Sequence, residues 1–176
     1  KGIELNGNNP TLLRAYGGFG SVSSPNYDTG LLHFLEKGGV YAFAKVRGGG
    51  EKGKNWHKEG KGLKKINSIN DFVDAAEFLI REKYTNPNKL AINGGSHGGL
   101  VVGAAMTQRP DLFKVVISEM GRLDMATLDK YTSGIHHFDE YGNPNNKEEF
   151  QSLISYSPYH TIKEDVNYPT CLIITS

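Results

Sequence analysis

The chain has 176 residues, a formal net charge of +1 and a single cysteine, Cys171. A net charge so close to zero provides no global field to attract nucleic acid or a membrane surface, so we expect neither as a partner. One cysteine excludes an internal disulfide and fits a reducing compartment, which favours a cytoplasmic location. The length is sufficient for one domain with a sizeable core.

Short apolar runs alternate with helical patterns along the chain. The apolar runs are continuous, which is typical of strands in a parallel sheet buried on both faces, and the alternation predicts an α/β fold. The segment 122–160 is rich in polar and aromatic residues and is expected to hold only short helices. In chain order, we expect strands at 11–16, 40–46, 89–93, 115–118 and 170–175, and helices at 31–35, around 72–80, and at 100–109.

The helix around 72–80 carries apolar residues at helical spacing. Ser68 followed by Asp71 resembles a capping box, so this helix is expected to begin there. The lysines between Lys52 and Lys65 precede it, and a run of this kind is expected to be solvated rather than to bind nucleic acid.

A glycine-rich segment, Gly48 to Asn55, matches two phosphate-binding patterns. Both patterns require a helix that begins at the loop, and the segment 56–65 is polar and lacks apolar periodicity. We therefore predict a tight loop without nucleotide. The histidines show no metal-ligand spacing, so neither a metal nor a cofactor is expected.

The most informative motif is Gly94-Gly95-Ser96-His97-Gly98, which fits G-x-S-x-G. It lies between the expected strand 89–93 and an expected buried helix, which is the context in which this motif presents a nucleophilic serine. Gly94 and Gly98 leave room where strand and helix cross. The N-terminus of the helix favours negative charge, which suits a serine that forms an oxyanion.

An oxyanion needs two hydrogen-bond donors. The loop after the first strand, Tyr16-Gly17-Gly18-Phe19, occupies the position from which this fold supplies one donor, either the tyrosine hydroxyl or a glycine N–H. The other donor is expected to be the backbone N–H of His97, the residue after the serine.

A serine nucleophile also needs a general base. In this fold the order along the chain is serine, acid, histidine, and the strand 170–175 is placed to carry the acid on its following loop. We therefore expect the catalytic Asp and His beyond Ser176. An internal substitute, Glu119 or Asp124 with His160, is the less favoured alternative.

Several segments together resemble the prolyl oligopeptidase family of serine peptidases. The resemblance follows the order of the chain over nearly its whole length. It is carried by Tyr16 to Phe19, Arg47 to Glu51 with Gly53, Trp56 and His57, Asn93 to Gly99, Gln108 to Phe113, and Tyr156 to Pro158.

This resemblance implies that residues 1–176 are part of an α/β-hydrolase catalytic domain, without its N-terminal strands, its β-propeller partner and its C-terminal Asp and His segment. It also implies hydrolysis of short peptides after proline through an acyl-enzyme, with little activity in these residues alone. Ser96 resembles the nucleophile, the Tyr16 hydroxyl and the His97 amide resemble the oxyanion donors, and Phe19 and Tyr141 resemble pocket walls.

Two positions depart from the family pattern. His137 stands where a tryptophan usually stacks on the substrate proline, and Arg122 stands where a small apolar residue is expected. Both changes alter a pocket for an apolar ring. Three alternatives stay open: an acylaminoacyl or dipeptidyl-type peptidase, a carboxylesterase of the same fold, and a hydrolase-fold binding domain without catalysis.

Overall fold

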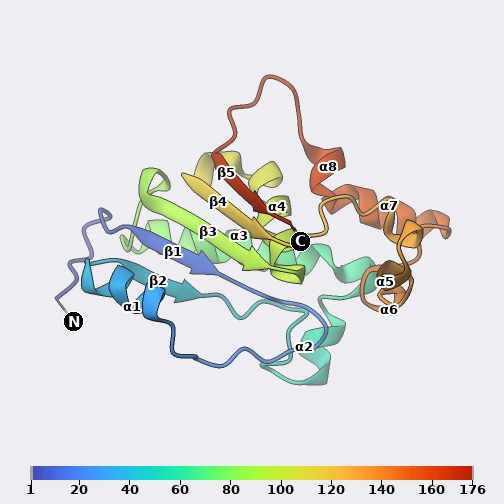
Figure 1. Cartoon of the computed structure of the whole chain (residues 1–176), viewed down its shortest axis with the longest axis horizontal. Coiled ribbons are helices and arrows are strands. Elements are labelled where there is room, and N and C mark those ends of the chain that lie inside the picture. The colour runs from blue at the N-terminus through green and yellow to red at the C-terminus, as the bar shows by residue number, and fades with distance from the viewer. Residues whose placement is uncertain (1, 176) are drawn as a thin grey trace.

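The computed structural model describes residues 2–175, apart from the side chain of Thr132. Five parallel strands form one sheet in the order β2-β1-β3-β4-β5. All the strands point their carboxyl ends toward the end of the molecule where α2 (Lys54–Lys58), α5 (Thr132–Ile135) and α6 (Phe138–Tyr141) lie (Figure 1). The strands are β1 (Thr11–Arg14), β2 (Val40–Phe43), β3 (Leu90–Gly95), β4 (Val115–Glu119) and β5 (Thr170–Ile174).

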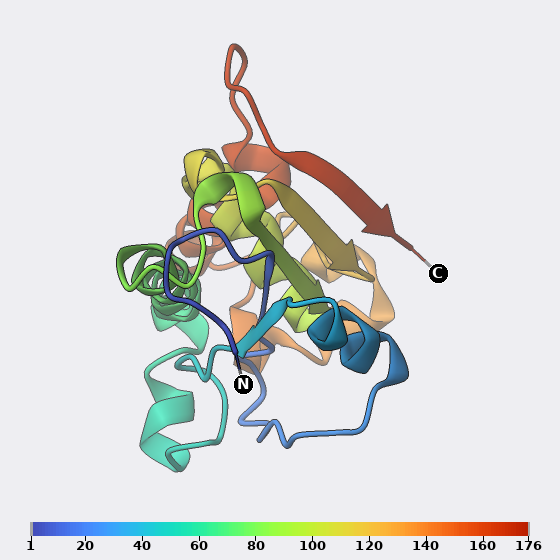
Figure 2. The ribbon, with the colours of Figure 1, turned by 90° about the vertical axis from the view of Figure 1, so that its left-hand side faces the viewer.

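The helices cover the sheet unequally. Helices α3 (Ile66–Arg81) and α4 (His97–Gln108) pack together on one face, and Figure 2 shows α1 (Thr29–Glu36) on the opposite side, beside β2. The α-helices are α1 (Thr29–Glu36), α2 (Lys54–Lys58), α3 (Ile66–Arg81), α4 (His97–Gln108), α5 (Thr132–Ile135), α6 (Phe138–Tyr141), α7 (Lys147–Tyr156) and α8 (Pro158–Thr161). Short 3₁₀ turns lie at Gly62–Lys64, Pro87–Lys89, Pro110–Leu112 and Leu128–Lys130.

Two apolar clusters meet at α4. Its sequence is apolar on every side, and the structure buries it between the sheet, α3 and α8. One cluster joins Leu13 and Ile92 of the sheet to Phe72 of α3. The other joins Leu100 of α4 to Leu153 of α7. The second cluster ties the segment after β4 to the domain, and this segment forms one side of the site described below.

The predicted α/β architecture and its five strands are confirmed, but burial on both faces is wrong for β5. Every residue of β5 is exposed, whereas β1 and β3 are largely buried. An apolar run shows that a strand is suited to burial, but the covering layer has to come from elsewhere in the chain. Within residues 2–175, the Cys171 thiol of β5 lies 3.1 Å from Met106 Sδ of α4, but this contact leaves every residue of the strand exposed.

The predicted start of α3 is also wrong. The helix begins at Ile66, so Ser68 and Asp71 lie inside it. Ser68 Oγ donates to the Arg47 carbonyl at 2.6 Å, and the Asp71 carboxylate accepts from the Arg47 backbone and guanidinium. These polar side chains hold the loop after β2 instead of capping their own helix.

A helix that the sequence did not predict begins within the glycine-rich segment. The five residues of α2 begin directly after Gly53, whose φ is +85°. No residue of α2 is buried, so apolar periodicity gave no signal for it.

Candidate active site

Ser96 occupies a sharp turn between β3 and α4. Its φ of 54° and ψ of −116° fall in a region that residues with side chains rarely adopt, and its backbone N–H donates to the Glu119 carbonyl at 2.8 Å. Ser96 is exposed, whereas His97 and the helix that follows are buried. The turn therefore presents one hydroxyl at the carboxyl end of the sheet.

Glycines on both sides make this turn possible. A Cβ on Gly94 would overlap the Gly98 carbonyl, and a Cβ on Gly98 would overlap the Ala15 carbonyl of the loop after β1. Because backbone atoms cannot yield as a flexible side chain does, strand, turn and helix approach one another only with glycine at these positions.

The loop after β1 brings Tyr16 to the serine. The Tyr16 phenol lies near enough to the Ser96 hydroxyl for the serine to affect its pKa. Burial raises the pKa of Tyr16, the Ser96 hydroxyl opposes this rise, and the charge of Glu140 adds to it. Tyr16 therefore stays protonated at neutral pH, and a phenol in this state donates a hydrogen bond to a negative oxygen.

The imidazole of His97 holds this loop in place. It is 1% exposed, with Nε2 3.0 Å from the Gly17 carbonyl and Nδ1 3.0 Å from the Tyr141 hydroxyl. A carbonyl only accepts, so Nε2 carries the proton. Burial, reinforced by the charge of Lys65, lowers the pKa of His97 well below its ordinary value, so the ring is neutral and Nδ1 accepts from Tyr141.

The side chain of His97 thus joins the loop after β1, Tyr141 and the start of α4. Its backbone N–H is the first N–H group of α4. The first N–H groups of a helix have no partner within the helix, so this donor is available to a ligand at Ser96. Gly18 lies against the ring so closely that a Cβ there would overlap it. Both predicted oxyanion donors therefore lie beside Ser96.

A hollow of about 380 Å³ opens next to Ser96. All the predicted site residues except Tyr16 line this hollow. Tyr16 lies beside the serine but outside the lining. Aromatic rings form one wall, where Phe19 meets His137 at 5.0 Å and Tyr141 at 5.7 Å between ring centroids. The lining residues are Phe19, Ser96, His97, Met120, Gly121, Arg122, Leu123, Asp124, Thr127, Tyr131, Ser133, His137 and Tyr141.

The internal acid and histidine do not reach Ser96. His160 lies 3.7 Å from Asp124, but its Nδ1 is engaged with Ser157 Oγ at 2.9 Å. Glu119 accepts from the Asn93 side chain at 2.5 Å. Within residues 2–175 no histidine is hydrogen-bonded to Ser96, and no group of three His, Cys, Asp or Glu side chains forms a possible metal site.

Behind the aromatic wall lies a buried ionic cluster that sequence reasoning missed. Glu140, 4% exposed, accepts from Lys65 Nζ at 2.5 Å, from His57 Nε2 at 2.8 Å and from the backbone N–H of Phe19 at 2.9 Å. Phe19 has a φ of +57°, and this bond holds it there. The cluster therefore fixes the end of the loop that carries Tyr16.

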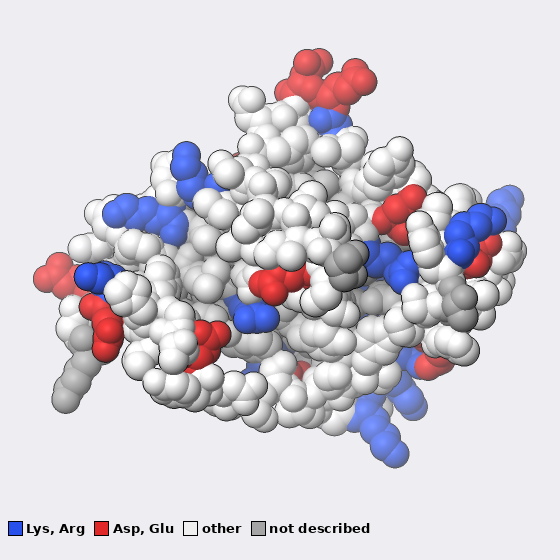
Figure 3. Space-filling model, in the orientation of Figure 1, with Lys and Arg blue, Asp and Glu red and all other residues white. Residues whose placement is uncertain are grey.

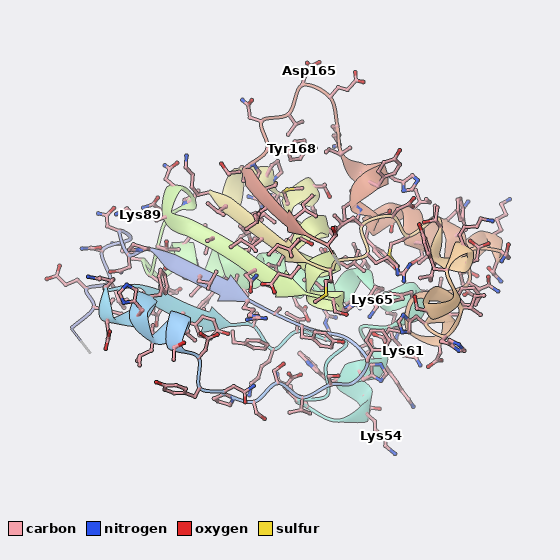
Figure 4. The ribbon with its side chains drawn as sticks, viewed as in Figure 1. Lys54, Lys61, Lys65, Lys89, Asp165 and Tyr168 are labelled. Atoms are coloured by element: carbon pink, nitrogen blue, oxygen red, sulfur yellow. The ribbon has the colours of Figure 1, made fainter. Side chains whose placement is uncertain are left out.

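The expectation that the whole lysine run is solvated is wrong for Lys65. Its side chain is completely buried, and Figure 4 places it inside the molecule, whereas Lys54 extends from the edge. Burial lowers the pKa of Lys65, and Glu140 opposes the change. A signal was present in the sequence, because Lys65 precedes Ile69 by four residues and Phe72 by seven, on the apolar face of α3.

Elsewhere the charged side chains are dispersed. On the face shown in Figure 3, acidic and basic groups are interspersed among uncharged ones. No helix within residues 2–175 has the length and apolar character needed to cross a bilayer.

A parallel sheet with a serine at the strand-to-helix turn, beside a phenol from the loop after the first strand, defines an α/β-hydrolase. The sequence pattern of the prolyl oligopeptidase family matches residues 25–176. The chain belongs to this family.

Individual relatives agree with this assignment. The prolyl endopeptidase of Dictyostelium discoideum is 44% identical over 171 residues, which are 96% of this chain and 22% of the relative. That of Elizabethkingia meningoseptica is 44% identical over 177 residues, which are 100% of this chain and 25% of the relative. The chain thus spans about a quarter of the length of these relatives.

Solved structures show the same likeness in three dimensions. A structure from a study of two prolyl endopeptidases superposes with a TM-score of 0.96 at 48% identity, covering 98% of this chain and 26% of that one. Prolyl oligopeptidase B from Galerina marginata superposes with a TM-score of 0.95 at 38% identity, covering 98% of this chain and 25% of that one.

Proposed function

We propose that the full-length protein is a serine peptidase that cleaves short peptides after proline through an acyl-enzyme on Ser96. The observation that carries the proposal is the exposed Ser96 hydroxyl, held in a strained turn beside the Tyr16 phenol. The prolyl endopeptidases to which the chain is similar support the substrate class.

In the proposed reaction, Ser96 Oγ attacks the scissile carbonyl and its proton passes to a histidine base. The carbonyl oxygen becomes an oxyanion that accepts from the Tyr16 hydroxyl and the His97 N–H. The C–N bond then breaks, the amine leaves with the proton from the histidine, and an ester to Ser96 remains. Water hydrolyses this ester by the same route and regenerates the serine.

The base in this proposal comes from outside residues 1–176. The His97 ring is excluded, because both of its nitrogens are engaged and its protonated form is disfavoured by burial. We assign the role to an Asp–His pair later in the full-length chain, which would also carry a β-propeller. In this arrangement Phe19, Tyr141, His137 and Arg122 form the pocket for the residue before the scissile bond.

We place the protein in the cytoplasm. Cys171, the single cysteine, is a free and exposed thiol, which a reducing compartment preserves.

The test uses the full-length protein with a fluorogenic proline peptide and a fluorophosphonate probe for activated serines. Ser96→Ala is expected to abolish both peptide hydrolysis and labelling. Ser155→Ala is the matched control, since Ser155 is an exposed serine on α7 that donates to Ser152. Hydrolysis that persists in Ser96→Ala would refute the proposal.

A further inference from the structure

Arg122 is a cation that lines the hollow beside Ser96, and no carboxylate among residues 2–175 pairs with it. Arg122 donates to Ser133 Oγ at 3.3 Å and lies 5.6 Å from the ring centroid of Tyr131. Among the described residues, no carboxylate oxygen lies within 4.0 Å of its guanidinium. Arg47 differs, because it is paired directly with Asp71.

The acidic groups nearby are engaged elsewhere. Asp124 also lines the hollow, but its Oδ1 accepts from the Ala126 N–H at 3.0 Å and lies 3.7 Å from His160. Glu140 lies behind the aromatic wall, outside the lining, where Lys65 and His57 bind its two oxygens. Neither carboxylate satisfies the guanidinium of Arg122.

The charge of Arg122 acts on the wall of the hollow. It lowers the pKa of His137, where burial is the larger cause, and it opposes the burial that raises the pKa of Tyr141. The other charges that act on His137 are those of His136 and Glu140, and Asp124 is not among them. Of the two charged residues that line the hollow, Arg122 is therefore the one whose charge acts on His137 and Tyr141.

We propose that Arg122 makes this hollow a carboxylate-binding pocket, which extends the substrates from proline peptides to peptides with Glu or Asp before the scissile bond. A guanidinium binds a carboxylate through two parallel N–H bonds, and partial burial strengthens them. The rings of Phe19 and His137 would pack on the methylene groups of the side chain. A neutral side chain of the same shape leaves the guanidinium without its acceptor.

This inference rests on the proposed peptidase activity of Ser96, so the test separates the two. Three peptide substrates with Glu, Gln or Pro before the same chromogenic leaving group are compared on the full-length protein. We expect kcat/KM for Glu to exceed that for its isostere Gln by roughly 10-fold to 100-fold. The ratio is expected to fall as salt rises, since screening weakens partly exposed charge pairs.

Three variants complete the design. Arg122→Leu is expected to reduce the Glu-to-Gln ratio to about one and to raise the Pro-to-Glu ratio, and Arg122→Lys, which keeps the charge without the fork, to give an intermediate ratio. Arg81→Leu is the matched control, because Arg81 is 66% exposed on α3 and pairs with Glu82. It is expected to keep the wild-type ratios.

The outcomes are distinct. Equal rates for Glu and Gln in the wild-type protein, or a Glu-to-Gln ratio unchanged in Arg122→Leu, overturn the carboxylate pocket even where Ser96-dependent cleavage after proline stands. Cleavage of all three substrates that survives Ser96→Ala overturns the proposed function instead.

Discussion

The Nε2–H of His97 donates to the Gly17 carbonyl at 3.0 Å, although 80 residues separate the two in sequence. The bond links the residue after the serine turn to the loop that carries Tyr16. The His97 side chain therefore positions the loop that carries Tyr16 relative to the turn that carries Ser96. Its role is to hold this geometry and not to transfer a proton.

Replacing His97 by alanine is expected to destabilise the protein by about 3 kcal/mol or more. The substitution opens a cavity and leaves the Gly17 carbonyl and the Tyr141 hydroxyl without their partner. Denaturant unfolding of the full-length protein measures the change. His33→Ala on the exposed surface of α1 is the control, and equal stability of the two variants would contradict the linking role of His97.

The same histidine predicts a pH dependence of stability. The unfolded ring has its ordinary pKa near 6.5, whereas the folded ring has a pKa well below this. Below pH 6.5 the unfolded state therefore binds more protons than the folded state. As the pH is lowered, this group reduces the stability by up to about 1.4 kcal/mol per pH unit. Above pH 6.5 its contribution is complete. Unfolding curves measured from pH 5 to 8 should show that the stability of His97→Ala falls less steeply on acidification than that of the wild type. This difference in slope is expected only below about pH 6.5.

The close approach at the serine turn predicts that Gly98→Ala is strongly destabilising, by about 1–3 kcal/mol or more. Its methyl group would meet the backbone carbonyl of Ala15. Gly95→Ala is the matched control, because its methyl group would meet no atom closer than the 4.0 Å contacts with Glu119. Thermal unfolding compares the two, and a Gly98 variant as stable as the Gly95 variant would count against the geometry of this turn.

Removing the charge of Glu140 is expected to cost about 3–5 kcal/mol, because Lys65 is left buried without its counter-ion. Glu140→Gln is compared with Asp139→Asn, which removes the neighbouring carboxylate that pairs with Lys61 at the surface and is expected to change stability little. Chemical denaturation measures both. A small effect of Glu140→Gln would show that the buried cluster does not support the loop at Phe19.

Tyr16→Phe is expected to lower kcat by about 100-fold to 1,000-fold with little change in KM, because the lost hydroxyl acts on charge that develops in the transition state. Steady-state kinetics of the full-length protein on a proline peptide give both constants. Tyr27→Phe is the control, since Tyr27 is 81% exposed. A larger effect on KM than on kcat would assign Tyr16 to substrate binding instead of oxyanion stabilisation.

The sequence by itself determined the elements around Ser96. A glycine pair around the serine, an apolar run before it and an apolar helix after it are local features, and they specify the strand, the turn and the helix because backbone geometry depends on neighbouring residues. The order of the strands and helices likewise follows from local periodicity. Resemblance of motifs then supplied the roles proposed for Tyr16 and Phe19.

Only the tertiary structure decided how distant side chains pair. Glu140 meets Lys65 across 75 residues, and nothing next to Glu140 in the sequence indicates that it is buried. The exposure of β5 likewise depends on what packs over it, which its own residues do not encode. Apolar periodicity reports which face of an element suits the core, but the partner of a buried charge is set by the path of the whole chain.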